Sequence, residues 1–208
     1  VARHLGNIGI VLNIQKKHQE ALEYNKRAIK VLEELGDKTQ LAGEFGNIAT
    51  TYGFLGNNEL SLEYDLKALA INTEINYANG IILSLMNVSN HYADLKKNAL
   101  AEAYAKKALK IADSIKSVEM QCEAEKVLSE FYQRTNQPIL ALEHYKKHTV
   151  LKDSLFNAES TKKSIRSEMN FQFEKKQAAD SVYNLEQMKH KQLIHEQQIQ
   201  EQKIYTYT

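Results

Sequence analysis

The histidines are the residues best suited to chemistry in this chain of 208 residues. His144 and His148 are four residues apart, so on a helix they share a face, as two histidine ligands of a zinc ion would. A zinc site needs about three or four convergent ligands, and no Cys, Asp or third His lies at a suitable spacing. Glu143 is adjacent to His144 and does not lie between the two histidines, as in His-Glu-x-x-His. The sequence therefore predicts no metal site, and these histidines pack in the fold or lie in solvent.

The other residue types that serve catalysis are not arranged for it. None of the seven histidines lies in a segment that resembles a phosphoacceptor site. The segment 43–46 contains two glycines, but it falls within a predicted helix and no Gly-Lys-Ser or Gly-Lys-Thr follows it, so it is not a phosphate-binding loop. The sequence therefore predicts that this chain is not an enzyme and holds no cofactor. Any catalytic activity of a longer parent would need a domain outside these residues.

Three asparagines, Asn7, Asn47 and Asn87, recur at intervals of forty residues. A carboxamide carries a donor and an acceptor together, and a peptide bond needs both from a partner. Residues that share the helix face of these asparagines complete a candidate binding surface. The candidates are Asn7, Ile10, Ile14, Asn47, Thr50, Phe54, Asn87, Asn90, Asp94, Glu130 and Arg134. The alternative is that the asparagines cap or bridge neighbouring helices without any ligand.

The elements that must position these candidates belong to a repeat of forty residues that aligns without a gap. Its first half carries apolar residues at helical spacing, and its second half repeats small and aromatic residues. The first halves align at Gly6-Asn7-Ile8-Gly9, Gly46-Asn47-Ile48-Ala49, Met86-Asn87-Val88-Ser89 and Lys126-Val127-Leu128-Ser129. The second halves align at Tyr24, Tyr64, Tyr104 and His144, and then at Ala28, Ala68, Ala108 and His148. Each copy predicts two helices that cannot bury their apolar faces alone and must stack on the next pair.

The composition agrees with an all-α protein. Eight Gly, one Pro, one Cys and no Trp leave little to punctuate a sheet or to build a disulfide scaffold. With 27 basic and 26 acidic residues, the net charge of +1 gives no excess for binding the phosphates of nucleic acid. No run approaches the roughly 18 apolar residues of a membrane span, and the first residues carry neither an initiator Met nor a signal-like block. We expect the chain to be cut from a longer protein.

Residues 2–157 resemble four tetratricopeptide repeats of the 40-residue variety, at about 2–41, 42–81, 82–121 and 122–157. The resemblance implies a right-handed α-solenoid of four helix-turn-helix repeats over residues 1–157, followed by a long C-terminal helix over 158–208. The fourth copy departs from the pattern at Glu125, which stands at an apolar position, and at His144 and His148, which suggests a terminal repeat with different packing. Cys122 aligns with Ala2, Ala42 and Ile82, which predicts a small, buried and unreactive residue.

The same resemblance implies where a ligand binds. In domains similar to this one, the first helices line a concave groove, and an asparagine at the repeated position bonds the backbone of an extended peptide. The basic clamp with which chaperone-binding members hold a terminal carboxylate is missing, because Gly6, Gly46 and Met86 stand where Lys would be needed. The expected ligand is therefore a peptide or protein segment other than a chaperone tail.

The repeat register fails from about residue 153, and no Gly or Pro follows. Ile165, Met169 and Phe173 step by four residues, which predicts a helix that caps the last repeat. A continuous helix from about 161 to 203 would extend roughly 60 Å. A sparse apolar seam within 177–204 predicts a homodimer through a coiled-coil-like stalk, against the alternative of a stalk that stays single. The seam consists of Val182, Leu185, Leu193 and Ile199.

Two segments, Lys152–Asn157 and residues 171–176, resemble a junction found in bacterial signalling proteins of the Bacteroidetes type. In these, tetratricopeptide repeats lead into a charged helix, one membrane span and an output module such as a histidine kinase, nucleotide cyclase or phosphatase. The resemblance implies a non-catalytic, peptide-binding sensor segment on the periplasmic or extracytoplasmic side, whose only link to the membrane is a span outside these residues. The alternative is a cytoplasmic adaptor that dimerises through its C-terminal helix.

Overall fold

The structure is a computed structural model that describes the backbone of residues 1–206; it describes side chains to residue 171 and for residues 173–177, 181 and 188. Over the described backbone the chain forms eight α-helices and no strand. The helices are α1 (Ala2–Ile14), α2 (His18–Leu35), α3 (Lys38–Phe54), α4 (Asn58–Glu74), α5 (Ala78–Asp94), α6 (Asn98–Ser114), α7 (Val118–Arg134) and α8 (Pro138–Thr206). The predicted all-α fold is confirmed.

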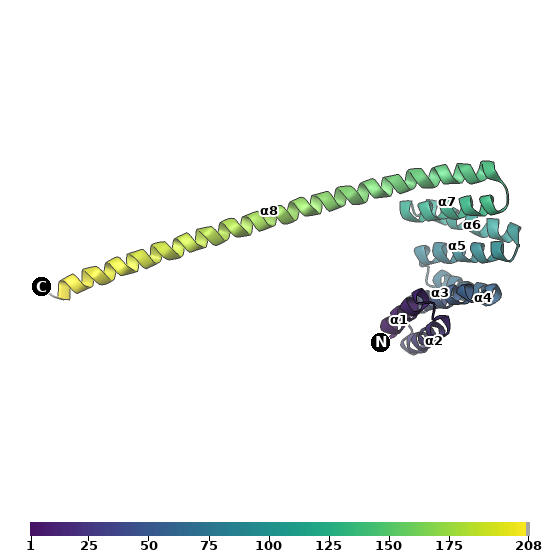
Figure 1. The fold of residues 1–208 in the computed structure, drawn as a ribbon, viewed down its shortest axis with the longest axis horizontal. Coiled ribbons are helices and arrows are strands. Elements are labelled where there is room, and N and C mark those ends of the chain that lie inside the picture. The colour runs from purple at the N-terminus through teal and green to yellow at the C-terminus, as the bar shows by residue number, and fades with distance from the viewer. Residues whose placement is uncertain (207–208) are drawn as a thin grey trace. The chain divides into compact units, whose positions relative to one another are not determined.

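Consecutive helices pack in pairs, and each pair stacks on the next (Figure 1). Helices α1 and α2, α3 and α4, and α5 and α6 form the first three pairs, and the second helix of each pair contacts the first helix of the following one. In the fourth pair, the hydroxyl of Ser129 on α7 donates a hydrogen bond to the carbonyl oxygen of Ala141 on α8 (3.0 Å). This arrangement is the predicted solenoid of four helix pairs.

The turns between helices also recur regularly, and the interval between them is half the length of the sequence repeat. A residue with left-handed backbone geometry ends every helix from α1 to α7, at intervals of twenty residues. Only two of these residues are glycines, which adopt this geometry without strain. The seven are Lys16, Gly36, Gly56, Asn76, Lys96, Lys116 and Asn136. Regular turn geometry therefore does not depend on regular turn sequence here.

Small residues bring the two helices of a repeat close together. Ala21, Ala28, Ala101 and Ala108 are completely buried, as their recurrence predicts. Serine hydroxyls use the short distance between helices to bond backbone carbonyls across it: Ser61 bonds the oxygen of Ala49 (2.6 Å) and Ser89 bonds that of Ala101 (2.7 Å). Each bond satisfies a buried hydroxyl at a point where a larger side chain would separate the helices.

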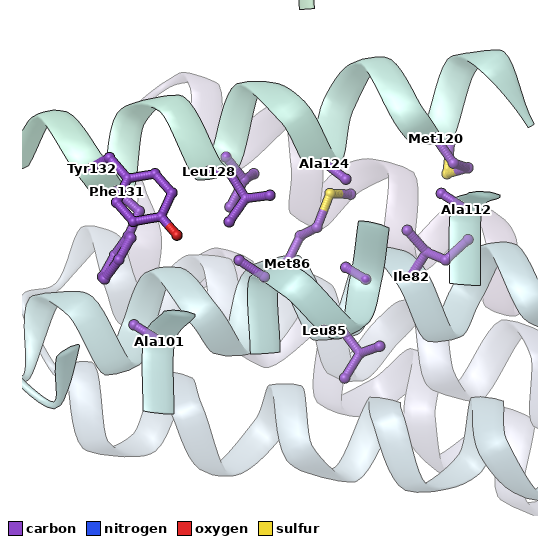
Figure 2. Packing of buried hydrophobic residues seen from close by; sticks show 13 residues of the cluster. Ile82, Leu85, Met86, Ala101, Ala112, Met120, Ala124, Leu128, Phe131 and Tyr132 are labelled. Carbon is purple, nitrogen blue, oxygen red and sulfur yellow. The ribbon is translucent and has the colours of Figure 1, made fainter. Parts of the chain in front are cut away.

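A hydrophobic cluster joins α5, α6 and α7 (Figure 2). Its larger members come from α5 and α7, and α6 contributes alanines that let the other two helices approach. The cluster comprises Ile82, Leu85, Met86, Ala101, Ala105, Ala108, Ala112, Met120, Ala124, Val127, Leu128, Phe131 and Tyr132. The second half of the solenoid therefore has a mostly apolar interior.

Two of the fourth-repeat residues that depart from the repeat pattern contact each other. Glu125 on α7 and His144 on α8 form a buried pair, with 2.5 Å between Oε2 and Nδ1. The His144 ring also stacks on Tyr132, with 5.3 Å between ring centroids. Cys122 is buried, as predicted, and its Sγ lies 3.3 Å from Nδ1 of His148. The fourth repeat is thus a variant with its own polar contacts.

By its internal contacts the chain divides into residues 1–155 and residues 156–208. The capping of the solenoid by Ile165, Met169 and Phe173 stays a prediction. The side chains of the proposed seam, Val182, Leu185, Leu193 and Ile199, lie outside the described ones. No described helix is both long and apolar enough to cross a membrane.

Candidate functional site

Two adjoining cavities lie between α3 and α5, with α4 behind them. They have volumes of about 320 and about 290 Å³, and they share Thr50, Asp65 and Asn87. The larger is lined by Thr39, Ala42, Gly43, Gly46, Asn47, Thr50, Asp65, Ala68, Asn72, Tyr77, Gly80, Leu83, Ser84 and Asn87. The smaller is lined by Thr50, Gly53, Phe54, Asn58, Asp65, Asn87, Asn90, His91 and Asp94. We call the two cavities together the α3/α5 groove.

The repeat explains why these side chains converge. Thr50 and Asn90 occupy the same position of successive first helices, as do Asn47 and Asn87. Because stacked repeats place equivalent positions side by side, one face of α3 and one face of α5 line the same groove. Small residues on α3, such as Gly43 and Gly46, leave the space open.

Asp65 on α4 is the central polar residue of the groove. It is 1% exposed, and its Oδ2 lies 2.9 Å from Nε2 of His91 on α5. Its Oδ1 accepts a hydrogen bond of 3.2 Å from the carboxamide of Asn87. A buried carboxylate must be hydrogen-bonded to remain in the fold, and these two contacts tie α4 to α5.

Ser61, His91 and Asp65 together contain the residue types of a hydrolase triad, but their geometry is not that of a triad. Ser61 Oγ and Asp65 Oδ2 both lie 2.9 Å from the same ring nitrogen, Nε2 of His91. A triad needs the carboxylate on one ring nitrogen and the hydroxyl on the other. In addition, Ser61 donates its proton to the carbonyl oxygen of Ala49 and is completely buried. The cluster is therefore built for packing and polarity, with no nucleophile poised for attack.

The structure brings together six of the eleven predicted site residues. Asn47, Thr50, Phe54, Asn87, Asn90 and Asp94 all line the α3/α5 groove. Asp94 also pairs with the predicted Arg134 (3.1 Å) at a neighbouring cavity of about 520 Å³ that both residues line. Glu130 is half-buried on α7.

The remaining candidates lie on α1. Asn7, Ile10 and Ile14 are exposed, with Ile14 at 77%. None of the three lines either cavity of the α3/α5 groove. The structure therefore concentrates the candidate site on the second and third repeats.

The asparagines also make contacts within the fold. The Asn47 carboxamide donates to Oε2 of Glu44 (3.3 Å), and that of Asn87 donates to Asp65 (3.2 Å). The Asn87 contact joins α5 to α4, whereas the Asn47 contact stays within α3 and bridges no helices. The carboxamide oxygens accept no hydrogen bond from the described part of the chain, so a ligand can still use them as acceptors.

Sequence reasoning missed the back of the groove, above all Asp65 and His91. Asp65 aligns with Asn25, Ala105 and Tyr145, so its carboxylate stands at a position that is buried in each of the first three repeats. A charged residue at a repeated core position is a signal of a special contact, as it was for Glu125. His91 gave no comparable signal, because its aligned positions hold Thr51 and Phe131 and share no chemistry.

The histidines considered for a metal site have other partners. His144 pairs with Glu125, and Nδ1 of His148 donates a hydrogen bond to the backbone oxygen of Cys122 (3.0 Å). Across the described residues there is no group of three or more His, Cys, Asp and Glu side chains that could hold a metal ion.

Comparisons with known proteins agree with this architecture. Residues 1–74 match the profile of the tetratricopeptide repeat family. The apo form of RapI is similar in structure, with a TM-score of 0.67 and 23% identity over 77% of this chain and 58% of that chain. The Rap conjugation gene regulator of the plasmid pLS20, in complex with the Phr* peptide, gives a TM-score of 0.61 and 18% identity over 68% of this chain and 40% of that chain.

BtubC from P. vanneervenii is also similar, with a TM-score of 0.64 and 14% identity over 74% of this chain and 64% of that chain. No curated protein matches the sequence. At these identities the likeness establishes the fold, which is that of a tetratricopeptide-repeat solenoid. The chain spans less than two thirds of each of these structures.

Proposed function

We propose that residues 1–155 form a non-catalytic module that binds an extended peptide or protein segment in the α3/α5 groove. The observation that carries the proposal is the pair of adjoining cavities, in which the predicted asparagines of two successive repeats line one continuous surface. A solenoid presents such a surface to segments that run along it. A similar structure of the same fold is in complex with a peptide, which supports this use of the fold.

The groove offers mainly hydrogen-bonding groups to its ligand. Thr50 is exposed, and Asn87 and Asn90 line the same cavity. An extended backbone presents an N–H and a C=O at each residue, so carboxamide and hydroxyl groups can pair with it regardless of its side chains. We therefore expect affinity to come from the backbone and selectivity to come from the deeper polar residues.

The wider role that we propose is that of a sensor. The chain would be the extracytoplasmic segment of a membrane-anchored signalling protein, and binding in the groove would change the arrangement of α8 and of an output module beyond it. A ligand can do this only if it binds one arrangement more tightly than the other. The length of α8 also supports the alternative role, a cytoplasmic adaptor that dimerises through this helix. Reading the residues that flank 1 and 208 in the parent gene, and locating the tagged parent protein by fractionation, distinguishes the two roles.

Peptide binding is tested by selecting ligands for the full chain from a displayed peptide library and measuring their affinity by calorimetry. Replacing both Asn47 and Asn87 by Ala should cost about 1–3 kcal/mol of affinity through lost hydrogen bonds. Asn7→Ala is the matched control, because Asn7 holds the same repeat position outside the groove. Unfolding of the double variant, or equal losses in the control, would show that the asparagines are structural and would remove the main support for the proposal.

A further inference from the structure

We infer that the peptide bound in the α3/α5 groove carries an aromatic side chain, Phe or Tyr, that enters the smaller cavity and packs against Phe54. This inference rests on the proposed function and names the class of residue that anchors the ligand. Among the described residues that line the smaller cavity, Phe54 is the large apolar one. The exposure of its ring, the support behind the ring and the polarity of the cavity lead to the inference.

The first observation is that the Phe54 ring is uncovered where it lines the cavity. Phe54 is 61% exposed. The preceding residue, Gly53, also lines the cavity and has no side chain that could fill it. The cavity has a volume of about 290 Å³, near the lower end of the size range of ligand pockets. It therefore suits one side chain of a peptide whose backbone stays outside.

The second observation is that the Phe54 ring is supported from behind. The ring of His18, at the start of α2, stacks on it with 5.2 Å between centroids and 28° between planes. His18 Nδ1 donates to Oδ1 of Asn13 on α1 (3.0 Å), and the carboxamide of Asn13 donates to the hydroxyl of Thr51 on α3 (2.7 Å). Thr51 is completely buried, so these contacts connect His18 to the interior. A ring that is already held in place loses little conformational freedom when a ligand packs against it.

The third observation is that the rest of the smaller cavity is polar. Apart from Gly53 and Phe54, its lining consists of Thr50, Asn58, Asp65, Asn87, Asn90, His91 and Asp94. An aliphatic side chain would take these groups out of water and offer them nothing in return. An aromatic ring can stack on Phe54 and turn its positive edge toward their oxygens, and a Tyr hydroxyl can bond to them. Contact between two rings raises affinity by a factor of about 2 to 10 beyond the effect of buried area.

Phe54 adds to the selectivity that the polar residues of the groove provide. The equivalent positions of the other repeats hold Ile14, Asp94 and Arg134. Asp94 and Arg134 pair with each other (3.1 Å), and Ile14 lines neither cavity of the groove. The second repeat alone therefore has an aromatic ring at this position. A peptide that bonds through its backbone could bind in several registers, and an aromatic residue beside Phe54 would select one of them.

The test uses the full chain and mixtures of N-acetylated, C-amidated octapeptides in which one position is fixed as Phe, Tyr, cyclohexylalanine or Ala. Cyclohexylalanine is close to Phe in size but has no aromatic ring, so it separates an aromatic preference from an apolar one. We expect the Phe and Tyr mixtures to bind best in calorimetry. The cyclohexylalanine mixture should bind about 2 to 10 times more weakly, and the Ala mixture should bind most weakly.

Variants at position 54 assign this preference to one ring. Phe54→Ala should lower the affinity for the best aromatic peptide about tenfold, but should lower the affinity for the analogue with Ala in place of the aromatic residue less than about twofold. Phe54→Tyr keeps the ring and should keep the affinity. Phe54→Leu should abolish the preference for Phe over cyclohexylalanine. Phe156→Ala is the matched control, because Phe156 is 70% exposed, lines neither cavity and should not affect binding.

Two results would refute the inference while the proposed function stands. One is that the Phe and Tyr mixtures bind no better than the cyclohexylalanine mixture. The other is that Phe54→Ala weakens the aromatic peptide and its Ala analogue equally. Failure of every mixture to bind would refute the proposed function itself, and the inference with it.

Discussion

The buried pair of Glu125 and His144 gives the most specific test of how the repeats tolerate variation. In the other repeats the aligned pairs are Leu5 with Tyr24, Phe45 with Tyr64, and Leu85 with Tyr104. The Phe45 and Tyr64 rings contact each other, with 5.9 Å between centroids. In the fourth repeat, a polar pair therefore occupies the place of an apolar contact.

The cost of breaking the pair depends on which partner is removed. The side chains of His144 and Glu125 are 12% and 8% exposed. His144→Tyr leaves a buried carboxylate without its partner, which should lower the free energy of unfolding by about 3–5 kcal/mol. Glu125→Leu leaves only an unsatisfied imidazole and should cost about 1–3 kcal/mol. The double variant restores the residues found in the third repeat, and its stability should lie within about 1 kcal/mol of the unmodified chain.

The assay is urea unfolding of the four proteins, followed by circular dichroism at 222 nm and arranged as a double-mutant cycle. The expected coupling energy is about 3 kcal/mol or more. The exposed pair Glu63 and Lys67 is the control, and Glu63→Gln should change the stability by less than about 1 kcal/mol. Additivity of the two substitutions within about 0.5 kcal/mol would refute the reasoning, because it would mean that neither residue depends on the other for its place in the core.

Other predictions concern strain and buried charge. Lys116 has a φ of 53°, a left-handed backbone geometry that glycine adopts without strain, so Lys116→Gly should raise the free energy of unfolding by about 1 kcal/mol. The control Lys107→Gly, in the interior of α6, should lower the free energy of unfolding by about as much. Urea unfolding measures both. Burial raises the pKa of Glu44, and a hydrogen bond from Asn47 opposes this shift. The folded state therefore favours the protonated acid, and this contribution to stability is lost as the pH rises through the folded pKa. Glu44→Gln should therefore be more stable than the unmodified chain at neutral pH, by about 1 kcal/mol, and the difference should vanish below the ordinary pKa of a glutamate; melting curves across pH test this. Gly6→Ala should cost about 1–3 kcal/mol in the same assay, because its Cβ would lie 1.9 Å from Oε1 of Glu44, and adding Glu44→Ala should recover most of the loss.

The repeat made the fold predictable. The forty-residue register placed each predicted helix pair, and the buried positions of Ala21, Ala28, Ala101 and Ala108 followed from their recurrence. The capping of the last repeat by Ile165 was predicted from an equally regular spacing and stays a prediction. Spacing along one helix shows which side chains share a face, but it does not show whether a partner covers that face.

The site was predictable only where it repeats. Asn47, Thr50 and their equivalents on α5 were found because repetition places them on one surface. Asp65 and His91 are 26 residues apart and have no equivalents in the other repeats, so their contact depends on the packing of α4 against α5. A single sequence does not contain that information, because a polar residue at a core position has many possible partners.

Helix α5 is the element through which binding in the groove would have to reach the rest of the solenoid. One face of it lines the groove through Asn87 and Asn90, and the other contributes Leu85 to the apolar cluster in Figure 2. Helix α7 packs against α5, and the start of α8 bonds to α7 through Ala141. The cluster already fixes α5 against α7. A ligand could therefore alter α8 only by moving α5 together with this cluster, and such a movement requires a second packing of the cluster with nearly the same free energy.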